Sequence, residues 1–207
     1  HVNYIKNKTK KSRKLAGEIM LAKSFCYAQD VYGAESYIKG FSGYALELLV
    51  SYYGSLLGFI KAVTRSDINQ NNKLMIDPAR FYKNKQDILL SLNEAKLQSP
   101  IIFVDPTFKQ RNVLAALSDE TFFKFTEACK KFLANPSLKF FEKHKLDIEK
   151  LKKYSKDKKA EFFALRAETD RQEGDIAGSK LLKFFNLFSE EIEKLVFVFE
   201  KEFVYRE

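Results

Sequence analysis

The sequence predicts an α+β protein, with a mainly helical domain that carries a two-stranded hairpin, followed by a small α/β unit. Three observations favour this class. Apolar residues have helical spacing in the first half, two short apolar segments end in Asp-Pro, and apolar and polar residues alternate in segments near the end. Of the 207 residues, 45% are hydrophobic and 20 are Phe. Such a composition supplies a core and excludes a disordered chain.

Two helices are predicted in the first 64 residues. Leu15, Ile19, Ala22 and Cys26 recur at spacings of three and four, which predicts a helix over 14–29. Three glycines interrupt the pattern before residues 44–64 resume it. Apolar residues occupy most of the circumference there, so one long, largely buried helix is expected.

The hairpin is expected from residues 73–77 and 101–105, because each short apolar segment ends in Asp-Pro and suits a strand closed by a turn. The polar residues 79–98 between them could hold a short helix. Residues 113–134 are predicted to be helical with a restart at Ser118, a suitable N-cap, and Asn135-Pro136 ends that helix.

A change in composition predicts a boundary between a domain of residues 1–141 and a second unit of residues 142–207. Residues 139–159 are lysine-rich and expected to be part helix and part linker. A strand over 160–168, a helix over 176–195 and a strand over 197–205 then follow. This order is half of a split βαβ sandwich, so the unit is either incomplete or completed by other chain.

Composition also limits the compartment and the kind of partner. The two cysteines, Cys26 and Cys129, have no close partner at metal-ligand spacing, which argues against disulfides and zinc and favours a reducing cytoplasm. No apolar run is long enough for a membrane span, and no signal peptide is evident, so no membrane partner is expected. The chain begins with His rather than Met, which suggests a start inside a longer reading frame or after a removed tag.

The charge is strongly basic and clustered. Subtracting 27 acidic from 36 basic residues leaves +9. A run of basic residues is often only a solvent-exposed face of the protein. Two lysine clusters nevertheless favour a polyanionic partner, and nucleic acid is favoured over a membrane surface. The residues expected to bind RNA are Lys6, Lys8, Lys10, Lys11, Arg13, Lys14, Lys139, Lys143 and Lys145.

The residues alone reveal no catalytic centre, since no P-loop, no nucleophile–His–acid order and no metal-binding His cluster stands out. They do indicate an anion site. Residues 40–44 precede a predicted helix, whose N-terminal N–H groups would lie beside Ser42. Ser42 could equally be a plain N-cap and Arg111 a surface arginine, whereas Lys23 lies at the edge of an apolar stripe, where its stem could be packed.

Seven blocks of residues carry a family resemblance. They are Val31–Glu35, Lys39–Tyr44, Glu47–Leu49, Tyr53–Ser55, Val104–Pro106, Arg111–Ser118 and Asn135–Phe141. In order and spacing they resemble the region that follows the catalytic head in archaeal-type (class I) CCA-adding enzymes, the tRNA nucleotidyltransferases. The resemblance is specific over 1–141 and weaker over the remainder, which is collinear with the RNA-binding body and tail.

The resemblance implies a function for the first domain, which would be the helical neck. Such enzymes add C, C and A to the tRNA 3′ end from CTP and ATP, with two Mg²⁺ ions held by carboxylates of an N-terminal head. That head is absent here, so this chain is expected to be inactive by itself. It would work with a head supplied in cis or as a second subunit.

The resemblance also assigns nucleotide-binding residues: His1, Lys23, Tyr32, Ser42 and Arg111. Lys23 and Arg111 would neutralise the triphosphate, Ser42 would bind it, and Tyr32 would offer its hydroxyl or ring. The sequence departs from the family pattern after His1, where Thr is usual, at Lys39, where Arg is common, and in an insertion over 69–98.

Two alternatives from other classes remain. The chain could be a non-catalytic RNA-binding module that kept the fold, or an interaction protein whose Phe residues form a partner surface. A copurifying head would favour the enzyme, whereas a stable monomer with tRNA affinity would favour the RNA-binding module.

Overall fold

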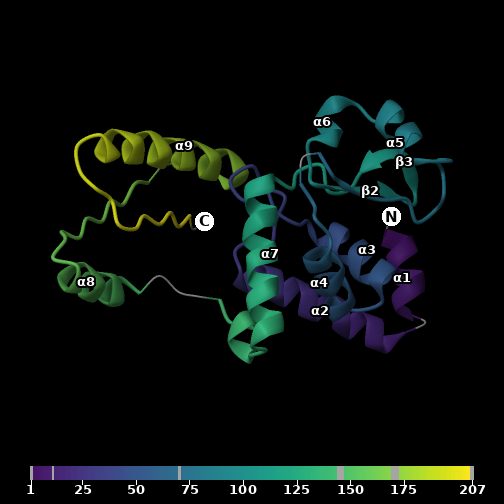
Figure 1. The fold of residues 1–207 in the computed structure, drawn as a ribbon, viewed down its shortest axis with the longest axis horizontal. Coiled ribbons are helices and arrows are strands. Elements are labelled where there is room, and N and C mark those ends of the chain that lie inside the picture. The colour runs from purple at the N-terminus through teal and green to yellow at the C-terminus, as the bar shows by residue number, and fades with distance from the viewer. Residues whose placement is uncertain (1, 11, 70, 144–146, 169–172, 206–207) are drawn as a thin grey trace. The chain divides into compact units, whose positions relative to one another are not determined.

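The computed structural model describes residues 2–10, 12–69, 71–143, 147–168 and 173–205. The chain divides into two compact units, residues 1–143 and 144–207, and each is described by itself. The structure confirms the α+β class, because helices surround a small sheet in the first unit (Figure 1). The roles predicted for segments 1–141 and 142–207 remain predictions.

The first unit begins with two helices, α1 (Val2–Lys10) and α2 (Arg13–Ala28). The structure confirms the helix predicted over 14–29, and Ser12 caps it by accepting a hydrogen bond from Leu15 N. Helix α1 was not predicted, because the basic segment shows no apolar period. Among the described side chains of α1, Ile5 is buried in the main core and Tyr4 packs against it, so tertiary packing stabilises a helix that the sequence pattern does not indicate.

The single helix predicted over 44–64 is wrong, since the segment forms two helices, α3 (Gly43–Tyr53) and α4 (Leu56–Arg65), with 87° between them. Gly54 ends α3 in the left-handed region at φ 80°, and Ser55 caps α4 by accepting from Gly58 N. Both helices are so apolar that their sequence pattern resembles that of one continuous helix. Gly54 nevertheless ends α3, and Ser55 directly after it is the N-cap of α4. Among the described residues, no single helix is long and apolar enough to cross a membrane.

Replacing Gly54 and Gly17 with alanine should shift stability in opposite directions. A Cβ at either glycine would meet nothing within 4 Å, but Gly54 has a positive φ and Gly17 lies inside α2. Gly54→Ala should therefore cost about 1 kcal/mol through backbone strain, and Gly17→Ala should add about 0.5–1 kcal/mol. Urea unfolding followed by circular dichroism measures both changes in stability through the midpoint of unfolding. Midpoints that shift in the same direction for the two variants would contradict the different backbone roles given to Gly54 and Gly17.

The sheet of the first unit has three strands in the order β1 (Leu74–Ile76), β2 (Ile101–Asp105) and β3 (Phe108–Asn112). The two predicted strands exist but run parallel, so they form no hairpin; the hairpin joins β2 to the unpredicted β3. A parallel connection needs a crossover, which α5 (Lys85–Ser91) and α6 (Glu94–Leu97) supply. These two short helices confirm the helix predicted within 79–98 and lie beside the sheet in Figure 1.

Helix α7 (Asp119–Ala134) closes the unit; it confirms the helix predicted over 113–134 from residue 119 onward, whereas residues 113–118 are not helical. Ser118 Oγ accepts from Thr121 N, which confirms the restart at this residue. A 3₁₀ turn, η1 (Leu138–Phe141), then returns the chain to α2, where Gln29 Nε2 donates to Phe140 O at 2.9 Å. Phe25 of α2 lies against both phenylalanines of this turn, with ring centroids 6.4 Å from Phe140 and 5.6 Å from Phe141.

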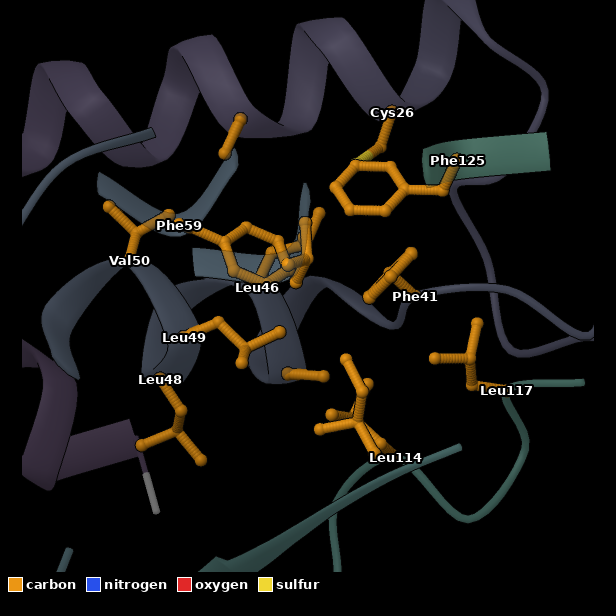
Figure 2. Close-up of a cluster of buried hydrophobic side chains, with 14 of the residues drawn as sticks. Cys26, Phe41, Leu46, Leu48, Leu49, Val50, Phe59, Leu114, Leu117 and Phe125 are labelled. Atoms are coloured by element: carbon orange, nitrogen blue, oxygen red, sulfur yellow. The ribbon is translucent and has the colours of Figure 1, made fainter. Parts of the chain in front are cut away.

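The main core lies between α2, α3, α4 and α7. Figure 2 shows the rings of Phe41, Phe59 and Phe125 together beneath α2, close to Cys26. The centroids of Phe41 and Phe125 are 4.8 Å apart, and those of Phe59 and Phe125 are 5.4 Å apart. Large aromatic rings thus fill the space where the four helices meet, and the start of α3 is fixed against this packed group.

The described part of the second unit contains two helices, α8 (Ile148–Asp157) and α9 (Gly174–Glu193), and no strand. The strands predicted over 160–168 and 197–205 are therefore wrong. One phenylalanine of each segment packs on α9 instead: the ring centroids of Phe163 and Phe188 are 6.0 Å apart, and those of Phe185 and Phe203 are 5.5 Å apart. Alternation predicted strands, but a strand also needs a neighbour to accept its hydrogen bonds.

Candidate functional site

The candidate site lies at the N-terminus of α3 and is formed by the loop of residues 31–42. The loop is closed by short hydrogen bonds: Phe41 N donates to Val31 O at 2.8 Å and Gly40 N to Gly33 O at 2.8 Å. A Cβ on Gly40 would stand 2.1 Å from Val31 O, so only glycine allows this approach. As a result Tyr32 bridges to Phe41, next to the start of α3.

Ser42 is the N-cap of α3, and its Oγ accepts from Ala45 N at 3.2 Å. The plain capping role that the sequence left open is thus observed. A hydroxyl that accepts in a cap still carries a hydrogen that it can donate. The first turn of a helix also presents N–H groups without partners inside the helix, together with the positive end of the helix dipole. The start of α3 is therefore suited to an anion.

Lys23 and Tyr32 meet over Gly43, the first residue of α3. A Cβ on Gly43 would lie 3.0 Å from the Tyr32 hydroxyl and 3.7 Å from Lys23 Nζ. The Lys23 ammonium is held by Glu47, whose Oε1 lies 2.6 Å from Nζ, and both side chains are partly exposed. A cation, a hydroxyl and a helix N-terminus are thus gathered around a residue without a side chain.

A buried carboxylate supports the next residue of α3. Asp105 at the end of β2 is fully buried, and its Oδ1 accepts from the Tyr44 hydroxyl at 3.1 Å. The same oxygen accepts from Thr107 N at 2.8 Å and from Thr107 Oγ1 at 2.7 Å. Burial, followed by the charge of Asp105, raises the pKa of Tyr44 to about 12. Tyr44 therefore stays protonated at neutral pH and serves as a hydrogen-bond donor.

Arg111 joins this group from β3. Its guanidinium carbon lies 5.8 Å from the centre of the Tyr44 ring, and Nη1 lies 3.8 Å from Asp105 Oδ2. Half of the Arg111 side chain is exposed, so its charge is accessible to a ligand. The structure thus links Arg111 through Tyr44 to the start of α3, where Lys23, Tyr32 and Ser42 lie.

Four of the five predicted nucleotide-binding residues are therefore placed around the start of α3. The fifth, His1, lies outside the described residues. Sequence reasoning did not select Glu47, Tyr44 or Asp105 as site residues. The turn residues Asp105-Pro106-Thr107 carried a usable signal, because Asp before Pro often closes a turn through its side chain. Nothing in the sequence pairs Glu47 with Lys23, which lies 24 residues earlier.

The residues predicted to bind RNA fall into two groups. Lys6 and Lys10 on α1 and Arg13 and Lys14 on α2 are exposed, as are Lys139 and Lys143 near η1. Lys8 lies in α1, but its side chain is outside the described part, as are Lys11 and Lys145 entirely.

Lys143 is held by two neighbours. Its Nζ lies 4.2 Å from the centre of the Tyr27 ring and 3.7 Å from Asp30 Oδ1. The lysine is thus anchored at the end of α2 with its ammonium at the surface.

Other chemistry is sparse in the part of the chain that the structure describes. No three His, Cys, Asp or Glu side chains gather there in a way that could hold a metal ion. Cys26 and Cys129 are buried free thiols, and burial raises the pKa of both. A cleft between the end of α4 and α7, lined by Val63, Asp67 and Phe122 among others, contains none of the predicted site residues.

Comparison with known proteins assigns a class to this fold and site. Residues 17–142 match the family described as tRNA nucleotidyltransferase, second domain. This stretch includes Lys23, Tyr32, Ser42 and Arg111, and it covers more than half of the chain. The chain therefore belongs to the tRNA nucleotidyltransferase family, and residues 17–142 are its second domain.

Individual relatives are CCA-adding enzymes of archaea. The chain is 39% identical to the enzyme of Pyrobaculum islandicum over 125 residues, which cover 60% of this chain and 26% of the relative. It is 35% identical to the enzyme of Archaeoglobus fulgidus over 152 residues, which cover 72% of this chain and 31% of the relative. It is 34% identical to the enzyme of Methanosarcina mazei over 141 residues, which cover 68% of this chain and 27% of the relative. The chain spans less than a third of the length of these relatives.

Proposed function

We propose that this chain is the nucleotide- and tRNA-binding portion of a CCA-adding tRNA nucleotidyltransferase that uses CTP and ATP. One observation carries the proposal: Lys23, Tyr32 and Ser42 converge on Gly43 at the start of α3, with Arg111 joined to them through Tyr44. A nucleoside triphosphate is the ligand that best matches two cations, a helix N-terminus and a hydroxyl. The family membership supports the same ligand.

In this proposal each residue has a separate task. Lys23, already held by Glu47 at 2.6 Å, places a compact charge beside the first turn of α3, where it neutralises phosphate. Ser42 keeps the first turn of α3 in place through its cap, and Tyr32 contributes a hydroxyl over Gly43. Arg111 presents a planar fork that can hold two phosphate oxygens. None of these groups activates a nucleophile, so the chain binds and orients the nucleotide.

The catalytic step belongs to other residues. Divalent ions, when bound, would activate the attacking tRNA hydroxyl and stabilise the charge on the transferred phosphate. We propose that they are Mg²⁺ ions held by a nucleotidyltransferase head, present in cis or as a second subunit, and that this chain by itself incorporates no CMP or AMP. A cytoplasmic location accompanies this role.

Direct titration tests the proposal. The 207-residue chain is expected to bind CTP and ATP with similar affinity, and inorganic tripolyphosphate should compete with both, because the recognised group is the triphosphate. Equilibrium dialysis with labelled nucleotide measures this, and cytidine without phosphates is the matched control that should not compete. A chain that binds neither CTP nor ATP would contradict the nucleotide-binding role.

A further inference from the structure

Two aspartates end neighbouring strands of the sheet in the same local sequence. Asp77 follows β1 and Asp105 ends β2, and each precedes a proline. Ile76 is paired with Phe103, so alternation along the strands places Asp77 on the face of Val104 and Asp105 on the opposite face. Asp77 accepts from Tyr82 N at 2.9 Å, on the face covered by α5 and α6. Only Asp105 faces Tyr44 and Arg111.

The turn after β2 does not require the negative charge of Asp105. Three donors converge on Oδ1: Thr107 N at 2.8 Å, Thr107 Oγ1 at 2.7 Å and the Tyr44 hydroxyl at 3.1 Å. An asparagine amide offers one acceptor oxygen in the same position. The turn and the contact to Tyr44 therefore explain one carboxylate oxygen and leave the other without a structural task.

The second oxygen, Oδ2, is buried, and no hydrogen-bond donor of the described residues reaches it; the same is true of Asp77 Oδ1. What distinguishes Asp105 from Asp77 among the described residues is an ion pair with an arginine. A buried carboxylate oxygen without a partner is costly unless a positive charge compensates for it. The compensating group is the Arg111 guanidinium, whose Nη1 lies 3.8 Å away, while the Asp105 side chain is only 1% exposed. The aspartate is thus fixed by the fold, and the half-exposed arginine is the partner that can move.

We propose that Asp105 is a positioning residue that holds the Arg111 guanidinium beside the Tyr44 ring, at the nucleotide-binding start of α3. The inference rests on the proposed function for its ligand. Asp105 touches no nucleotide in this arrangement. It acts through Arg111, by attracting the guanidinium to one place, and through Tyr44, by accepting its hydroxyl hydrogen. The nucleotide then meets an arginine that is already in position, which lowers the ordering cost of binding.

The test combines a spectroscopic signature of Arg111 with CTP affinity. The Nε–H resonance of Arg111 in the ¹⁵N-labelled chain can be assigned by its loss in Arg111→Lys. In the unmodified chain it should differ from that of a free arginine side chain, and in Asp105→Asn it should move to the free position. CTP affinity of Asp105→Asn should fall about two- to fivefold, with no further fall when Asp105→Asn is added to Arg111→Ala.

Asp77→Asn is the matched control, since it removes the same charge from the other Asp-Pro turn and should change neither readout. An Arg111 resonance unmoved by Asp105→Asn would overturn the proposal, as would a moved resonance with unchanged CTP affinity. A loss of affinity that persists in the Arg111→Ala background would show a merely structural role and would also overturn it.

Two further outcomes remain decisive. If Asp105→Asn does not fold, the resonance of the unmodified chain decides, because a free-arginine position would overturn the proposal and a restrained one would support it. A chain that binds no CTP at all would refute the nucleotide role of both residues. The resonance would then still report whether Asp105 holds Arg111, so the two failures are distinguishable.

Discussion

Replacing Lys23 with alanine is expected to weaken CTP and ATP binding to the same extent, about ten- to hundredfold. A charge-assisted hydrogen bond to phosphate is worth about 1.5–3 kcal/mol, which corresponds to that range. The structure adds a second effect of the same sign. Glu47, whose Oε1 now lies 2.6 Å from Lys23 Nζ, would lose its partner and repel an anion at the start of α3. Equilibrium dialysis with each labelled nucleotide measures the loss.

The matched control is Lys61→Ala, because Lys61 is an exposed lysine of α4 with no place in the site. It should leave both affinities unchanged. Tripolyphosphate should lose as much affinity for Lys23→Ala as the nucleotides do, since the contact is to phosphate. A variant that lost ATP but not CTP would instead assign Lys23 to the base, and unchanged affinities would leave it as a lysine at the edge of a helix.

Binding of tRNA to the chain is expected to weaken steeply with salt. Each neutralised phosphate adds about 0.7–0.9 to the slope of log affinity against log salt concentration, so about six contacts would cost roughly a thousandfold between 50 and 200 mM. Replacing the exposed residues Lys6, Lys10, Arg13 and Lys14 with alanine should reduce the slope by about three. Filter binding or fluorescence anisotropy at several salt concentrations gives the slope.

The control replaces two exposed lysines outside the basic clusters, Lys61 and Lys85, with alanine. Non-specific attraction to overall charge would flatten the slope for this variant as well, whereas a defined interface predicts that it changes little. A slope near zero for the unmodified chain would mean that the lysines of α1 and α2 are solvated surface residues that do not contact RNA phosphates.

The sequence predicted the helices best where a strong apolar period coincided with a cap. Ser118 is the clearest case, since a capping residue before two acids placed the start of α7 correctly. The break at Gly54 was missed because both sides of it are apolar, and pattern alone does not separate one buried helix from two. Strand β3 was missed for the opposite reason. Four of its five residues are exposed, so the turn before it, rather than any hydrophobic alternation, creates the strand.

The strands expected in the second unit show a further limit of pattern. Phe163 and Phe203 lie in alternating segments, but each packs against a phenylalanine of α9. Alternation specifies which residues seek an apolar surface and does not specify whether a sheet or a helix provides it.

The candidate site was predictable in part. Lys23, Tyr32, Ser42 and Arg111 were selected through the family resemblance, and the structure places them around one helix start. The residues that hold these four side chains in place were not predicted, because ion pairs such as Lys23–Glu47 join residues distant in sequence.

The loop that carries Tyr32 and Ser42 is tied to a helix that plays no part in the chemistry. Ser118 N donates to Lys39 O at 2.9 Å, and Thr121 Oγ1 donates to Ile38 O at 2.9 Å. Ser118 is the N-cap of α7 and Thr121 lies in its first turn. The helix is packed into the core through Phe122 and Phe125. Val31 and Phe41, near the two ends of the loop, are also buried in the core, so opening the loop would require breaking contacts of the core itself. We therefore expect its motions to be coupled to global unfolding, so temperature and denaturant should leave the geometry of the loop nearly unchanged until the whole unit melts.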